Sequence, residues 1–146
     1  MNVLYITLCQ HNSHLFKNMD IELKAKIRTT LEKCWSPDTS VIFSESMPPS
    51  YGQCAQTAIV ICEFFGGEIL KTDGWHGQGR HFYNRINGER CDFTADQFTA
   101  NPDYSHSIEY KDILSSPNEA ENETNSIQIS NLRYAFEIEW KKINSD

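Results

Sequence analysis

Long apolar runs and basic clusters are both missing from this sequence. No stretch reaches the roughly 18 consecutive apolar residues that cross a bilayer. The first residues carry neither an early Lys or Arg nor a small-residue cleavage site, so we expect no secretory signal. The 13 Lys and Arg stand against 20 Asp and Glu, a formal net charge of −7. Binding to a nucleic-acid backbone needs concentrated positive charge, so we expect a cytoplasmic protein with no nucleic-acid and no membrane partner.

Paired cysteine motifs are missing as well. The five cysteines are odd in number and widely spaced, at positions 9, 34, 54, 62 and 91, which predicts free thiols rather than a disulfide framework. A zinc site would have to draw on Cys54, Cys62, His81 and Cys91, without any CxxC, CxxH or HExxH spacing. We therefore expect no metal and no cofactor.

The chain of 146 residues is long enough to bury a core of its own. Hydrophobic residues make up 39% and charged residues 23%, as in ordinary globular proteins. We expect a single domain over residues 1–146. Residues 115–126 are acidic, rich in hydroxyl groups and poor in apolar side chains, which predicts a mobile acidic loop at that point.

Hydrophobic spacing predicts both helices and strands. Helices are expected from about residue 20 to 35, from 52 to 65 and from 130 to 143. Strands are expected over residues 68–72, 81–86 and 89–94, the last two joined as a hairpin through Asn87 and Gly88. Residues 2–9 fit either a strand or the start of a helix. Helices and an antiparallel sheet in one chain predict the fold class α+β.

Cys54 occupies the first turn of the helix that is predicted to begin near Gly52. Unpaired N–H groups and the positive end of the helix dipole favour a thiolate at such a position. Gln53 could place an amide donor beside a developing oxyanion, together with the backbone N–H of Cys54. Cys54 also continues the apolar stripe of its helix, however, and a free cysteine is more often a small buried hydrophobe.

The predicted hairpin places a histidine and an aspartate on one face of the sheet. With a two-residue loop at Asn87 and Gly88, His81 and Asp92 become diagonal neighbours, roughly 7–8 Å apart at the backbone. The carboxylate could then hold the imidazole Nδ1–H, which leaves the other ring nitrogen to take a proton from a thiol. A bulge at Gly88 would turn Asp92 to the opposite face. The competing interpretation is structural, with His81 half-exposed on its strand and Asp92 capping the turn that follows.

Four further residues are candidates for binding a substrate near these groups. Asn84 and Gln97 could orient the histidine or bind an amide, although both could simply satisfy backbone groups. Trp75, in the Gly-rich loop 73–79, and Tyr83 could line a cleft, although aromatic residues often serve only in packing.

The chain closely resembles the YunG family of small bacterial proteins in two stretches, GQCAQTAIVICEFFGGEILKT (52–72) and GRHFYNRINGERCDFTADQF (79–98). WSPDTS (35–40) resembles an upstream element of the same family. The family order of Cys, His and Asp is also that of papain-like and transglutaminase-like thiol enzymes, although the interval from Cys to His is short for a transglutaminase. The resemblance implies Cys54 as nucleophile, His81 as general base and acid, and Asp92 as the residue that orients His81. It also implies a papain-like or transglutaminase-like fold, in which the helix that carries the Cys packs on a small antiparallel sheet.

These features together predict a thiol-dependent amide hydrolase or acyl transferase, that is, a protease, a deamidase or a transglutaminase-like enzyme with a Cys-His-Asp triad. Thiolate attack on a carboxamide would give an acyl-thioester, which water or an amine then resolves. We expect a protein or peptide substrate, neutral or basic because the chain is acidic. The alternative is a non-catalytic module on the same scaffold that binds a peptide or a small ligand.

Overall fold

The structure is a computed structural model that describes residues 19–73, 80–99 and 108–145. The predictions for residues 2–9, for Trp75 and for most of the loop 73–79 lie outside these ranges. Within the described ranges, no helix is both long enough and apolar enough to cross a membrane.

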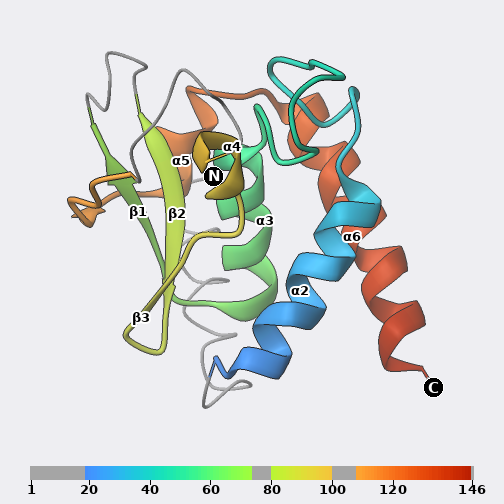
Figure 1. The fold of residues 1–146 in the computed structure, drawn as a ribbon. Helices are drawn as coiled ribbons and strands as arrows, with labels where there is room; N and C mark the ends of the chain where they lie inside the picture. Colours follow the sequence, from blue (N-terminus) through green and yellow to red (C-terminus); the bar gives the residue numbers. More distant parts are fainter. Residues whose placement is uncertain (1–18, 74–79, 100–107, 146) are drawn as a thin grey trace.

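Helices and an antiparallel sheet form three layers (Figure 1). The sheet is one outer layer, helix α3 (Cys54–Phe65) is the middle layer, and helices α2 (Ile21–Cys34) and α6 (Ser126–Asn144) form the other outer layer. Contacts between elements follow this order, since α3 packs on both the sheet and α6, while α2 packs on α6. The predicted α+β class, with the helix that begins at Cys54 packed on an antiparallel sheet, is therefore confirmed.

Helix α3 is buried on nearly all sides, whereas its sequence pattern predicts a single apolar stripe. Every residue from Ala55 to Cys62 is buried, including Ile59 and Val60 outside that stripe. A helix between two packed layers needs apolar residues around its whole circumference. Its predicted end is confirmed, because Gly66 has a positive φ of 78° and its N–H donates to the Cys62 carbonyl at 2.9 Å.

The sheet has four antiparallel strands in the order β3-β2-β1-β4. The strands are β1 (Glu68–Thr72), β2 (His81–Ile86), β3 (Glu89–Cys91) and β4 (Ile113–Leu114). The hairpin has the predicted register, which pairs Asn84 with Cys91. Asn87 and Gly88 both have positive φ values, 52° and 78°, as a type I′ turn requires.

Strand β3 is shorter than predicted, and β4 was not predicted at all. β3 ends at Cys91 instead of Thr94 because the chain turns there, with the Thr94 N–H donating to Asp92 Oδ1 at 3.2 Å. β4 is only two residues long and pairs with β1 at the sheet edge, too short a strand for an alternating pattern to reveal.

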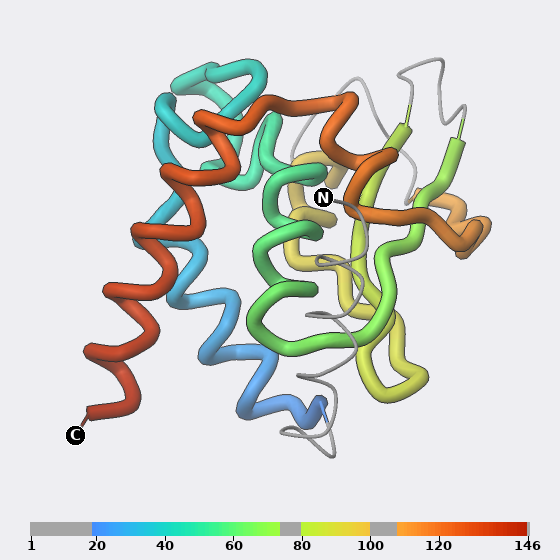
Figure 2. Tube along the Cα trace, turned by 180° about the vertical axis from the view of Figure 1, so that it is seen from behind, coloured from blue at the N-terminus to red at the C-terminus, as the bar shows by residue number. Residues whose placement is uncertain are grey.

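Helices α2 and α6 lie side by side along the back of α3 (Figure 2). α2 begins where predicted, since the Asp20 carboxylate accepts a hydrogen bond from the Leu23 N–H at 2.7 Å. α6 begins at Ser126, earlier than the predicted residue 130, because Asn125 caps it by accepting from the Gln128 N–H at 2.9 Å.

The prediction of a loop over residues 115–126 is wrong for much of that range. Residues Pro117–Glu121 form helix α5, and the Ser116 hydroxyl caps it by accepting from the Glu119 N–H at 3.2 Å. Ala120 is fully buried, and α5 packs on α3. One buried alanine and a Ser-Pro start are enough for a one-turn helix. The loop prediction was based on the acidic composition of this stretch, and composition does not reveal these two features.

The loop between α2 and α3 is held against the start of α3. The Gln56 amide donates to the carbonyl oxygens of Thr39 and Gly52. Gly52 has a φ of 74°, and a Cβ there would lie 2.5 Å from Ser40 Oγ. This close approach fixes the path of the chain immediately before Cys54.

Candidate active site

His81 and Asp92 form a buried hydrogen-bonded pair. His81 begins β2 and Asp92 directly follows β3, so the hairpin register brings them together. His81 Nε2 lies 2.7 Å from Asp92 Oδ2, and the two side chains are only 4% and 5% exposed. The contact itself follows the predicted register, while the roles of the two residues stay a prediction.

The nitrogen that Asp92 holds differs from the predicted one. The expected partner was Nδ1, but the carboxylate bonds Nε2. Nε2 is the ring nitrogen farther from the backbone. Nδ1 is thus the nitrogen left over, and it is buried with no hydrogen-bond partner among the described residues.

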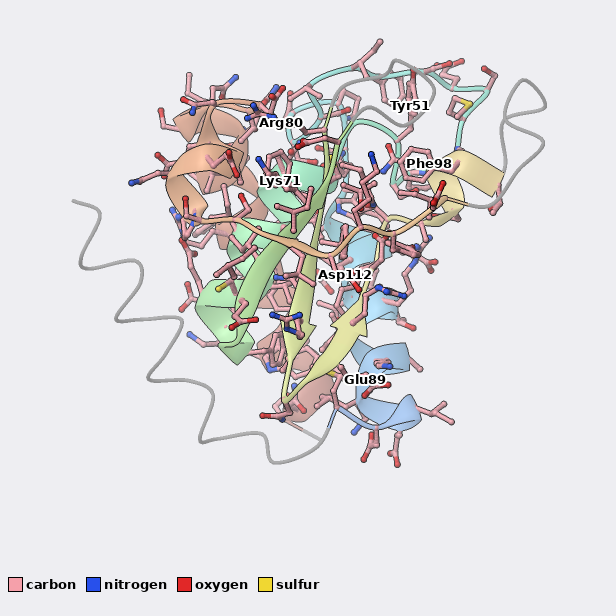
Figure 3. The ribbon with its side chains drawn as sticks, turned by 90° about the vertical axis from the view of Figure 1, so that its left-hand side faces the viewer. Tyr51, Lys71, Arg80, Glu89, Phe98 and Asp112 are labelled. Atoms are coloured by element: carbon pink, nitrogen blue, oxygen red, sulfur yellow. The ribbon has the colours of Figure 1, made fainter. Side chains whose placement is uncertain are left out.

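Three further donors hold Asp92 in place. The Tyr110 hydroxyl donates to Oδ2 at 2.7 Å. The Thr94 N–H and hydroxyl lie 3.2 and 3.4 Å from Oδ1. Sequence reasoning missed Tyr110, whose only signal is an aromatic residue in a polar stretch. Tyr110 belongs to the segment that also carries Asp112, and Figure 3 shows this segment crossing the outer face of the sheet.

Aromatic rings enclose the imidazole of His81. The Phe98 ring of the short helix α4 (Asp96–Thr99) packs edge-on against it with centroids 4.6 Å apart, and the Tyr83 ring stacks on it at 5.6 Å. Burial by itself lowers the pKa of His81, but the charge and the hydrogen bond of Asp92, with a smaller contribution from Cys54, raise that pKa to about 10. The imidazole is therefore protonated at neutral pH.

Cys54 is the first residue of α3 and lies close enough to His81 to influence its pKa. No side-chain hydrogen bond from Gln53 caps this helix, so the N–H groups of its first turn are not satisfied from that position. Of the cysteines in the described ranges, Cys54 alone is not fully buried, and it carries a free thiol. A partly exposed thiol at a helix N-terminus, beside an imidazolium, has the surroundings of a reactive cysteine.

The other described cysteines have different surroundings. Cys34 and Cys91 are free thiols, and burial raises their pKa values to about 12 and about 11. Both are thus expected to react slowly at neutral pH. Cys62 is disulfide-bonded, which contradicts the prediction of free thiols throughout.

Gln53 and Asn84 are bound elsewhere. The Gln53 amide donates to the Ser36 carbonyl at 3.2 Å and accepts from the Thr39 hydroxyl at 2.9 Å, so it fastens the preceding loop. Asn84 donates to the Ala58 carbonyl at 2.9 Å and joins β2 to α3. Neither side chain hydrogen-bonds to His81 or Asp92 within the described ranges, so for both the structural interpretation fits better.

Tyr83 and Gln97 are also buried rather than placed on an open cleft. The Tyr83 hydroxyl bonds Thr72 at 2.8 Å and Asp112 at 2.9 Å, so its contribution to the site is the ring that stacks on His81. Gln97 donates to the Thr94 hydroxyl at 3.1 Å and supports the residue that binds Asp92. Trp75 lies outside the described residues.

No metal-binding group is found in the part of the chain that the structure describes. None of its His, Cys, Asp and Glu side chains gather in sets of three or more that could hold an ion.

Comparison with known proteins identifies relatives by sequence. The profile of one family, described as YunG protein, matches residues 23–141. A relative from Bacillus subtilis (strain 168), named "Uncharacterized protein YunG", is 41% identical over 123 residues, which is 82% of this chain and 96% of the relative. No solved structure matches significantly. The matched region includes Cys54, His81 and Asp92.

Proposed function

The chain belongs to the YunG family, and from this premise we propose that it is a cysteine-dependent amide hydrolase or acyl transferase. Cys54 is the nucleophile, His81 the general base and acid, and Asp92 the residue that orients His81. The observation that carries the proposal is the buried Nδ1 of His81, which has no described hydrogen-bond partner while Asp92 occupies Nε2.

The protonation state of His81 supports this assignment. With a pKa raised to about 10, the ring carries two N–H groups at neutral pH. Asp92 accepts one of them, and the second is buried. A buried N–H needs a hydrogen-bond acceptor, and the Cys54 sulfur, which is close enough to raise the pKa of His81, is the acceptor that we propose.

The reaction follows from these groups. The Cys54 thiolate attacks the carbonyl carbon of an amide, and the backbone N–H at the start of α3 stabilises the oxyanion. Collapse of the tetrahedral intermediate breaks the C–N bond, and the Nδ1–H of His81 gives its proton to the leaving amine. The acyl-thioester is then resolved by water, which yields hydrolysis, or by an amine, which yields transfer. Asp92 keeps the ring oriented throughout.

We also propose that the arrangement is papain-like or transglutaminase-like. The chain order of Cys, His and Asp supports this, as does a helix that begins at the cysteine and packs on antiparallel strands. The proposed substrate is a protein or peptide amide. The proposed location is cytoplasmic, where the free thiol of Cys54 would stay reduced, although the disulfide at Cys62 is unusual in that compartment.

Alkylation with iodoacetamide under native conditions at pH 7 tests the proposal. We expect Cys54 to react at least about tenfold faster than Cys34 and Cys91, measured by peptide mass mapping. His81→Gln should slow the reaction of Cys54 about tenfold or more, because the counter-ion of the thiolate is lost. Tyr134→Ala, at an exposed position of α6, is the matched control and should leave the rate unchanged.

Equal labelling of the cysteines, or a Cys54 rate that His81→Gln does not alter, would contradict the proposal. The alternative, a non-catalytic module that binds a peptide or small ligand, would then be the better interpretation.

A further inference from the structure

A cavity of about 400 Å³ opens beside the start of α3, in the loop that joins α2 to α3. We propose that it is a subsite for an aromatic side chain of the peptide substrate, within two residues of the carbonyl that Cys54 attacks. This inference rests on the proposed function. The volume lies in the range of pockets that hold small ligands.

The lining of the cavity is mostly apolar. Its aromatic and aliphatic members include Trp35, Phe43, Met47, Pro48 and Tyr51. Phe43 is 55% exposed, so folding leaves much of a large apolar ring in water. Binding an aromatic side chain would remove that surface from water.

Two residues that line the cavity, Trp35 and Gln53, are held in place by contacts with the rest of the protein. The Trp35 indole N–H donates to the Thr57 hydroxyl at 3.0 Å, and the Arg28 guanidinium lies 4.9 Å above the Trp35 ring. Gln53 is held by its hydrogen bonds to the 36–39 turn. A preformed pocket binds with little loss of conformational entropy.

Two connections join the cavity to the candidate active site. Gln53 lines the cavity, and the next residue is Cys54. On the other side, the Ser50 hydroxyl donates to Asp96 of α4, the helix whose Phe98 ring packs on His81. Figure 3 shows Tyr51, which follows Ser50, at the same end of the molecule as Phe98. A peptide that lies across the thiol can therefore place a neighbouring side chain in this cavity.

Charge restricts what the cavity accepts. Glu45 is the one charged residue among those that line it, and the whole chain carries a net charge of −7. Glu45 and the net negative charge of the chain would therefore both repel an acidic side chain. The preferred occupant is an aromatic side chain, flanked by neutral or basic residues.

The test compares N-acetyl dipeptide chloromethyl ketones, with Phe-Phe, Ala-Ala or Glu-Glu as the dipeptide, against iodoacetamide. We expect the Phe-Phe reagent to alkylate Cys54 about tenfold or more faster than the other two. Phe43→Ala should remove most of that preference, measured as the ratio of the Phe-Phe rate to the iodoacetamide rate of the same variant. Glu45→Lys should raise the rate with the Glu-Glu reagent.

The matched control is Tyr134→Ala, which removes a similarly exposed aromatic ring from α6 and should keep the preference. Equal rates for the three dipeptides, while iodoacetamide still selects Cys54, would overturn the subsite and leave the proposed function standing. Failure of iodoacetamide to select Cys54 would overturn the proposed function and this inference with it.

A binding measurement tests the cavity without the thiol. In Cys54→Ala, titration with N-acetyl-phenylalaninamide should shift the NMR signal of the Trp35 indole N–H, and N-acetyl-glutamate amide should not. An unmoved Trp35 signal, or equal shifts with the two compounds, would overturn the subsite.

Discussion

Two opposing influences act on the pKa of His81, and together they set the chemistry of the site. Its burial disfavours the charged ring, but the Asp92 carboxylate outweighs burial and raises the pKa to about 10. Tyr110 and Thr94 donate to the same carboxylate and hold it beside the ring. The raised pKa of His81 is thus mainly a consequence of the charge and the hydrogen bond of Asp92.

This protonation state predicts how stability depends on pH. An unfolded histidine titrates near pH 6.5, whereas folded His81 titrates near pH 10. Between these values the folded state binds a proton that the unfolded state does not, so the free energy of unfolding falls as pH rises. The contribution of His81 is complete below pH 6.5 and is lost on passing through pH 10. Urea unfolding at pH 6.5 and pH 8 measures it.

Comparison with His81→Gln isolates the effect. The wild-type advantage over this variant should shrink with rising pH by at most about 1.4 kcal/mol per pH unit. The unfolding measurements stop at pH 8. Above this pH, Cys34 and Cys91, whose pKa values are also raised, would further lower the free energy of unfolding as the pH rises. In Asp92→Asn, burial lowers the pKa of His81 without an opposing charge, so the downward slope should vanish. An advantage that is constant or grows with pH would mean that folded His81 is neutral.

Among the elements, the turn before α3 depends on one glycine. Gly52 has a φ of 74°, and a Cβ there would collide with the Ile42 carbonyl and lie 2.5 Å from Ser40 Oγ. Gly52→Ala should therefore lower the free energy of unfolding by about 3 kcal/mol, as strain and collision add. Gly88→Ala is the matched control, since Gly88 has a similar φ of 78° with open space around it, and should cost only about 1 kcal/mol.

Urea unfolding of the two variants, with the same slope as wild type, measures both values. Equal losses at the two glycines would mean that the loop before Cys54 relaxes freely, against the close approach described above. Slower alkylation of Cys54 in folded Gly52→Ala would further indicate that this turn positions the thiol.

Elements with strong local signals could be predicted, and those set by tertiary contacts could not. Asn87 and Gly88 fix the hairpin register by turn chemistry alone, and that register brings His81 to Asp92. Helix α5 and strand β4 depend instead on packing against α3 and pairing with β1, which composition does not encode.

The candidate site likewise contains residues that local signals predict and residues that only tertiary contacts bring there. Cys54, His81 and Asp92 follow from a helix start and a hairpin, which are local features. Tyr110 reaches Asp92 from a segment 18 residues further along the chain, and no short-range pattern predicts that contact. Gln53 was a candidate oxyanion donor and Asn84 a candidate to orient the histidine or bind an amide. Their amides donate to the backbone carbonyls of Ser36 and Ala58, contacts that no short-range pattern reveals.

In the molecule as a whole, α6 stabilises the layer farthest from the sheet. Phe136 is fully buried, and its ring packs against Phe64, Phe65 and Trp140 at centroid distances of 4.9 to 6.1 Å. The Arg133 guanidinium adds two hydrogen bonds of 2.7 Å to Glu63 of α3. α6 therefore holds the back of the helix whose first residue is Cys54.

Phe136→Ala tests whether this layer acts on stability alone. Removing the ring leaves a cavity among aromatic side chains, so we expect a loss of about 3–5 kcal/mol in the free energy of unfolding. Tyr134→Ala, two residues away on the exposed face, should change it by less than about 0.5 kcal/mol. Because Phe136 contacts the far half of α3, Cys54 in the folded fraction should keep its wild-type alkylation rate. A Phe136→Ala protein that stays folded yet loses the selective reaction of Cys54 would mean that the packing of α6 sets the geometry of the site as well.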